Sequence, residues 1–242
     1  MATAIRDASG ARWATSMFPE AIGGFAHGAT GMGWALARLA VSGAGTPAER
    51  QAWLDVAHAA FDYEETLFHP DVGGWRDARS GVGARFLPNG CHGSTGIGLA
   101  ACDLHARTGA ARHLDVARRA AAAGLREGFG WSHTLCRGDL GLWELLERWR
   151  RIGPEALGAD RDGWDAAILS GLEERGPVGG WSWDAFTPGL MPGIAGILHL
   201  LLELHPESRL ATPLLLSLRE EAPGPPSGRQ AGTPKTAWRP VS

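Results

Sequence analysis

The stretch NGCHGSTGIGLA, residues 89–100, decides how this chain folds. Its two glycines, Gly93 and Gly96, are separated by two residues and stand directly before an apolar run. Internal repetition of such a pattern indicates an array of similar structural units. The same pattern, which we call a glycine core, occurs three more times in the sequence, starting at Gly28, Gly138 and Gly193.

Each glycine core opens a segment that we expect to be a buried helix. The apolar residues of these segments lie nearly all round a helix, which is typical of a helix enclosed by other layers. Amphipathic segments with helical spacing lie between them, at residues 48–68, 111–126 and 162–174. A capping box at Thr46–Glu49 opens the first of these. No convincing strand pattern is present. The alternation predicts an all-α fold, either a helical array or an (α/α) toroid of inner and outer helices.

Composition excludes several classes of protein. The chain has 242 residues, of which 44% are hydrophobic and 20% are charged, as in ordinary folded domains rather than disordered ones. A net charge of -3 gives no basic field for nucleic acid or an anionic membrane. We find no apolar run that could span a membrane and no secretory signal. Three cysteines are too few for a disulfide framework, so we expect free thiols and a cytoplasmic protein.

Two cysteines occupy matching places in two repeats. Cys91 and Cys136 each stand two residues before the first glycine of a core. Equivalent positions on inner helices converge at one rim of a toroid, so the two thiols form a plausible pair of zinc ligands. The alternative is that both are small buried residues, as cysteine often is. The third cysteine, Cys102, has the spacing of a core position.

Histidine is the other chemical candidate near the glycine cores. His27, His92 and His133 lie in or just before a core, where an imidazole can act as an acid or a base. The alternative is a structural or solvent-facing role. Arg137 takes the place that His27 and His92 hold in their cores; it cannot bind a metal or act as a base, but it can hold a carboxylate or an enolate. We expect Asp139 to cap its helix.

These segments together resemble the LanC-like domain of lanthipeptide cyclases, and most closely the cyclase domain of class II bifunctional synthetases. The resemblance covers roughly residues 23–216. It implies a double toroid of inner and outer helices, and the addition of cysteine thiols to dehydroalanine or dehydrobutyrine in a precursor peptide. The matching segments are residues 23–36, 89–100, 134–146 and 188–202, with the connector at 63–81.

The resemblance also assigns roles to individual residues. Cys91 and Cys136 match the two thiolate ligands of a Zn²⁺ ion. His27 matches the active-site histidine that moves a proton, and His92 matches a ring residue that lines the site. The family's third zinc ligand directly follows the second cysteine, and here that residue is Arg137.

The resemblance further implies an organisation and a set of partners. The family toroid contains more inner helices than the four glycine cores supply, so we expect an N-terminally incomplete toroid. We assign residues 1–22 to a lead-in, 23–221 to the cyclase domain and 222–242 to a disordered Pro/Gly-rich tail. The expected partners are a ribosomally made precursor peptide and either a separate dehydratase or an upstream synthetase half.

Other functions remain open at this point. The replacement by Arg137 is also what a degenerate, non-catalytic module would show, one that binds a peptide or a partner enzyme. A fragment of a split synthetase is a related reading. Another toroid enzyme, acting on glycans, would need paired carboxylates in a cleft. We rank it last, because the acidic residues of this chain fall mainly on outer-helix faces.

Overall fold

The computed structural model describes residues 4–153, 157, 161–180, 187–205, 208 and 210–215. The tail expected at 222–242 lies outside these residues. None of the described helices is both long and apolar enough to cross a membrane. The described helices, in chain order, are α1 (Ala29–Val41), α2 (Pro47–Glu65), α3 (Ser94–Thr108), α4 (Ala111–Glu127), α5 (Asp139–Ile152), α6 (Arg161–Arg175) and α7 (Ile194–Leu204).

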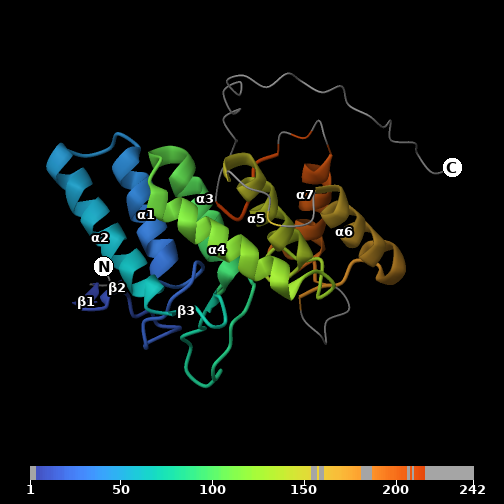
Figure 1. Cartoon of the computed structure of the whole chain (residues 1–242), viewed down its shortest axis with the longest axis horizontal. Helices are drawn as coiled ribbons and strands as arrows, with labels where there is room; N and C mark the ends of the chain where they lie inside the picture. The colour runs from blue at the N-terminus through green and yellow to red at the C-terminus, as the bar shows by residue number, and fades with distance from the viewer. Residues whose placement is uncertain are drawn as a thin grey trace.

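The helices form two layers, as the alternation in the sequence predicts. Figure 1 shows α1 and α2 at one side of the molecule, α3 and α4 in the middle, and α5, α6 and α7 at the other side. Each of α1, α3 and α5 packs against the helix that follows it, and α3 contacts both α1 and α5. Nearly all of α3 and α5 is buried, whereas α2 and α6 bury one stripe each. The architecture is therefore one of inner and outer helices, as the sequence predicts for an (α/α) toroid.

Within the described ranges, four short strands depart from the all-helical pattern. β1 (Ile5–Asp7) pairs with β2 (Gly10–Arg12), and β3 (Phe68–His69) pairs with β4 (Gly74–Trp75), both antiparallel. Strands of two or three residues are too short to show an alternating pattern, which is why the sequence did not indicate them. The second hairpin lies in the long connector between α2 and α3.

Two buried tryptophans link neighbouring helices through their indole N–H groups. Trp34 of α1 donates to Asp103 of α3 at 2.8 Å, and Trp143 of α5 donates to Asp165 of α6 at 2.7 Å. A buried indole N–H needs such a partner, since leaving it unpaired costs free energy. The indole rings therefore fill the core, and their hydrogen bonds fix how adjacent helices pack.

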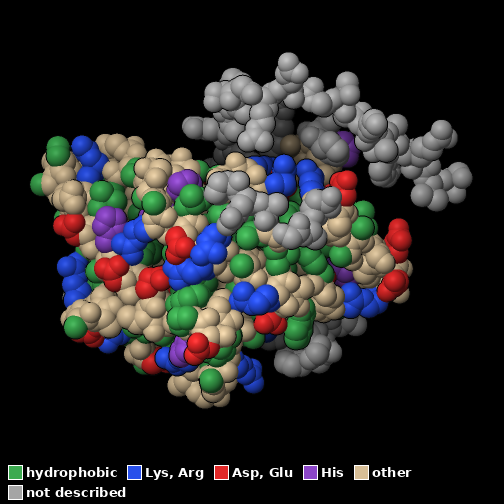
Figure 2. All heavy atoms as spheres, viewed as in Figure 1, with side chains coloured by type: hydrophobic (Ala, Val, Ile, Leu, Met, Phe, Trp, Pro, Cys, Tyr) green, Lys and Arg blue, Asp and Glu red, His purple; other side chains and the backbone are tan. Residues whose placement is uncertain are grey.

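The outer surface carries charges of both signs. Figure 2 shows basic and acidic side chains mixed over one face of the molecule. Several of them pair between outer helices, as Arg112 of α4 does with Asp62 of α2 at 2.8 Å, and Arg119 with Glu65 at 2.8 Å. This arrangement agrees with the absence of a basic field in the composition.

The four glycine cores share one backbone geometry. The first glycine of each is the residue before its helix, with φ between -120° and -133°. The next residue donates its backbone N–H to a carbonyl seven residues earlier, as Ser94 does to Leu87 at 3.1 Å and Ile194 to Thr187 at 2.8 Å. A Cβ on the second glycine would overlap the carbonyl oxygen six residues earlier. These pairs are Gly31 with Phe25, Gly96 with Gly90, Gly141 with Leu135, and Gly196 with Leu190.

Replacing such a glycine should destabilise the fold. In Gly196→Ala the new methyl group meets the Leu190 carbonyl, which belongs to the backbone and cannot rotate away. We expect a loss of about 2–4 kcal/mol in the free energy of unfolding, measured by urea denaturation. Gly189→Ala is the matched control, because the nearest atom to its new Cβ would be in Pro192, at an ordinary contact distance of 3.6 Å. Equal losses in the two variants would contradict this account.

Candidate functional site

The loops before the inner helices meet along one edge, which we call the rim: residues 22–28, 87–93, 132–138 and 187–193. Backbone hydrogen bonds join each loop to the next. The N–H groups of residues 25 and 26 donate to the Cys91 carbonyl at 3.0 and 2.9 Å, and Gly90 N donates to the Cys136 carbonyl at 2.7 Å. Cys136 N in turn donates to Met191 O at 3.2 Å. Residues far apart in the sequence therefore lie side by side at the rim.

The two candidate cysteines meet at the rim. Cys91 and Cys136 form a disulfide, with Cα atoms 6.1 Å apart, which lies in the usual range for such bonds. Their matched positions in the repeats predict this meeting. The sequence predicted free thiols, and for Cys91 and Cys136 the structure shows a disulfide instead. Cys102 is a free thiol in the core, as expected, and burial raises its pKa to about 12.

The side chains at the rim fit a zinc ion only in part. Two cysteine sulfurs converge, and in reduced form they are the ligands that zinc prefers. Among the residues that the structure describes, no three His, Cys, Asp or Glu side chains gather to hold a metal. Arg137, which follows Cys136, is exposed, and its guanidinium carries only hydrogen-bond donors, so it offers no lone pair to a metal ion. Binding of Zn²⁺ at the rim therefore remains a prediction.

The two candidate catalytic histidines lie against each other. The rings of His27 and His92 are stacked with their centroids 5.9 Å apart, and Phe18 packs against both, at 5.4 and 5.6 Å. His27 is exposed, whereas His92 is buried and its Nδ1 has no hydrogen-bond partner in the described structure. Burial lowers the pKa of His92 to about 4, so its ring is neutral at physiological pH. The site thus pairs a solvent-accessible imidazole with a neutral buried one.

An ion pair that sequence reasoning missed lies close to His92. Asp77 is almost fully buried, and Arg79 donates to it through Nε at 3.0 Å and through Nη2. Burial acts to raise the pKa of Asp77, but the Arg79 hydrogen bonds outweigh it and hold that pKa below its ordinary value. The charge of Arg79 also contributes to the low pKa of His92. Both residues lie in the long Gly-rich connector before α3, and that connector was the feature of the sequence that could have pointed to them.

The structure also places His133 and Asp139, the two other polar residues that the sequence indicated near the third glycine core. His133 turns away from the cysteines: its Nδ1 accepts from Val178 N at 3.0 Å, and its Nε2 lies against Gly171 of α6. The expectation that Asp139 caps its own helix is wrong, because its carboxylate accepts from the N–H groups of Gly130 and Trp131 instead. Gly138 precedes the helix without a side-chain cap. Both side chains therefore hold the loop before α5 in place.

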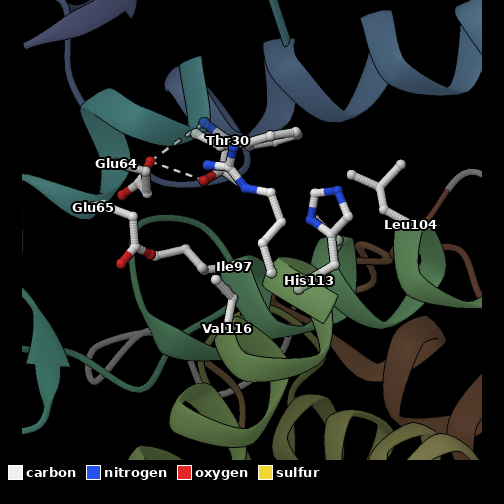
Figure 3. A pocket seen from close by; sticks show the side chains of 11 residues that line it. Thr30, Glu64, Glu65, Ile97, Leu104, His113 and Val116 are labelled. Atoms are coloured by element: carbon white, nitrogen blue, oxygen red, sulfur yellow. Dashed lines mark hydrogen bonds between the residues drawn. The ribbon is translucent and has the colours of Figure 1, made fainter. Parts of the chain in front are cut away.

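A small pocket, partly open to solvent, lies between α2, α3 and α4, with Thr30 of α1 at its edge. Figure 3 shows Glu64 reaching Thr30 at its upper edge, with His113 pointing into the space between the helices. Apolar side chains from α3, including Ile97 and Leu104, form most of one wall. Glu64, a buried carboxyl that sequence reasoning did not single out, connects this pocket with the loop that carries His27.

Comparisons with known proteins agree with the helical fold described above. A family model described as "Lanthionine synthetase C-like protein" matches residues 5–216. Eight chains of solved structures match, and one of them is nisin cyclase, with a TM-score of 0.57 and 20% sequence identity. That match covers 76% of this chain and 47% of nisin cyclase, so the chain spans about half the length of that protein. At this identity the likeness concerns the fold alone. No curated protein matches the chain.

The disulfide predicts a definite thiol count. Protein purified without reductant, unfolded and then alkylated, should take up one label, at Cys102, and three labels after reduction. Cys91→Ser should take up two labels without reduction, because Cys136 loses its partner. Reduction should also lower the free energy of unfolding by about 3–4 kcal/mol, given the 45-residue separation of the linked cysteines. Three labels on unreduced wild-type protein would contradict the pairing.

Proposed function

Because its family model matches residues 5–216, the chain belongs to the lanthionine synthetase C-like family, and from this we propose that it is a cyclase-type domain that acts on a precursor peptide. The proposed reaction adds a cysteine thiol of the peptide to a dehydroalanine or dehydrobutyrine of the same peptide. The products are lanthionine and methyllanthionine rings. We place this activity in the cytoplasm, after a dehydratase or an upstream synthetase half has supplied the unsaturated residue.

The reaction requires two proton movements. The peptide thiol gives up its proton, and its sulfur forms a bond to the β-carbon of the unsaturated residue. The π electrons of the carbon–carbon double bond move to give an enolate, which then takes a proton at the α-carbon. No group leaves, so the product has the mass of the reactant. An imidazole beside the reacting atoms can accept and return such a proton near neutral pH.

The observation that carries this proposal is the stacked pair of histidines at the rim. His27 is exposed and therefore accessible to a peptide, and the buried ring of His92 lies 5.9 Å from it, next to Cys91 in the sequence. We propose that His27 delivers the proton to the enolate and that His92 forms the wall against which the His27 ring packs. The Cys91–Cys136 pair lies in the adjoining loops.

Removal of the His27 imidazole should slow ring formation. A synthetic peptide with one cysteine and one dehydroalanine loses its alkylatable thiol when the ring closes, and mass spectrometry after alkylation measures this loss. We expect wild-type protein to exceed the uncatalysed rate and to give one product stereoisomer. His27→Ala should lower the rate by at least about 100-fold, the usual contribution of a general acid or base.

The control is His58→Ala, which removes an exposed imidazole from α2. It should leave the rate unchanged. If the wild-type chain, reduced or oxidised, does not exceed the uncatalysed rate for any peptide tested, the cyclase proposal fails.

We also propose that the reduced cysteine pair binds Zn²⁺ and that Arg137 keeps this binding weak. A bound zinc ion would lower the pKa of a peptide thiol. Arg137→His would place an imidazole beside the two thiolates and should tighten zinc binding at least tenfold, as measured by competition with a coloured chelator in thiol-free reductant. Arg137→Gln removes the charge without adding a ligand and is the control. Equal affinities for the His and Gln variants would refute the ligand role of this position.

A second candidate function rests on the incomplete donor set. With two joined sulfurs and no cluster of three possible metal ligands among the described residues, the rim also suits a non-catalytic module that binds a peptide or a partner enzyme. Saturable binding of the unsaturated peptide without thiol loss, in both redox states, would favour this function over catalysis.

A further inference from the structure

The carboxyl group of Glu64 lies in the interior although it comes from an outer helix. Glu64 occupies the last turn of α2 and is 3% exposed. Its Oε2 accepts hydrogen bonds from Gly24 N at 2.8 Å, from Thr30 N at 3.3 Å and from the Thr30 hydroxyl at 2.9 Å. Burial raises the pKa of this carboxyl, and the hydrogen bonds act in the opposite direction. An apolar side chain here would leave two buried N–H groups without a partner.

The two backbone positions held by Glu64 lie on either side of His27. Gly24 precedes His27 by three residues and Thr30 follows it by three. The loop between them is also bonded to the second repeat, because two of its N–H groups donate to the Cys91 carbonyl. Gly24 has a φ of +90°, and a Cβ on it would lie 2.7 Å from the His92 Cα atom. Glu64 therefore holds the His27 loop directly against the loop of the cysteine.

The second repeat shows that a glycine core can be built without such a carboxylate. Thr95 occupies the position in α3 that Thr30 occupies in α1. Its hydroxyl donates to the carbonyl of Pro88, which belongs to its own loop. In the first repeat the equivalent hydroxyl turns to Glu64 of the outer helix, as Figure 3 shows. The first repeat is also the one whose loop carries the exposed imidazole.

We propose that Glu64 is a positioning residue of this site, which holds the His27 imidazole against His92 and the Cys91 loop by binding the backbone on both sides of it. The inference deepens the proposed cyclase function, since the use of His27 in catalysis rests on that proposal. The placement of the His27 loop by Glu64 rests on the geometry alone.

The first test measures the loop without reference to activity. Amide hydrogen exchange of Gly24 and Thr30, followed by NMR on the full chain, should accelerate at least tenfold in Glu64→Ala, and the His27 ring resonances should move toward those of a free imidazole. Glu64→Gln should change both less, because its amide oxygen still accepts hydrogen bonds. The control, Glu65→Gln, alters the neighbouring residue, which pairs with Arg119 at the surface, and should leave both signals unchanged.

The second test separates positioning from stability. In the peptide cyclisation assay, Glu64→Ala should lower kcat per folded molecule at least tenfold and leave KM within about threefold, and Glu64→Gln should restore part of the loss. A purely structural role would lower the thermal midpoint and leave kcat per folded molecule unchanged. That result, or unaltered His27 resonances in Glu64→Ala, would overturn the proposal.

Two further measurements decide the role of Glu64 if Glu64→Ala does not fold or if the wild-type protein is inactive. Should Glu64→Ala not fold, Thr30→Ala removes the hydroxyl bond while keeping the carboxyl, and it should shift the His27 resonances in the same direction; no shift would count against the proposal. If wild-type protein shows no cyclisation, the proposed function fails, whereas the exchange and resonance measurements still decide the role of Glu64.

Discussion

The contact between a backbone carbonyl and the second glycine of each core is the constraint on which the structure depends. The loop folds back over the start of its own helix so closely that a side chain cannot fit between them. The first N–H of the helix is then satisfied by a carbonyl of the same loop, as between Ser94 and Leu87. Since each loop is held in this shape, its outward backbone groups face the next loop, and the four repeats join into one rim.

The reactive side chains of this fold lie at the rim, where groups far apart in the sequence come together. The imidazoles of His27 and His92 stack, and the sulfurs of Cys91 and Cys136 meet. Two buried carboxyls, Glu64 and Asp77, lie in the elements around them, each held by specific donors. Burying a carboxylate is costly unless it is well bonded, so these groups are surrounded by donors that also fix the loops.

The sequence was sufficient to predict the repeated elements of the fold and the features set by neighbouring residues. The glycine cores gave the inner helices, the capping box at Thr46 gave the start of α2, and the matched cysteines gave a meeting at the rim. What it could not supply depends on where side chains turn in three dimensions. The buried carboxyl of Glu64, the direction of His133 and the hydrogen bonds of Asp139 are set by packing against segments far away in the chain. Strands of two residues carry no periodic signal, so β3 and β4 could not be predicted either.

The bonds that join one rim loop to the next are made by backbone atoms. Their donors and acceptors are present with any residue except proline, which lacks the N–H, so the framework imposes little selection on the side chains of the rim. Arg137 shows this: it stands in a rim loop that keeps the geometry of its neighbours, although it removes the chemistry expected there. Scaffold and reactivity therefore depend on different atoms of the same loops. A single substitution at a rim side chain can therefore change the chemistry of the rim while the backbone bonds that shape it stay in place.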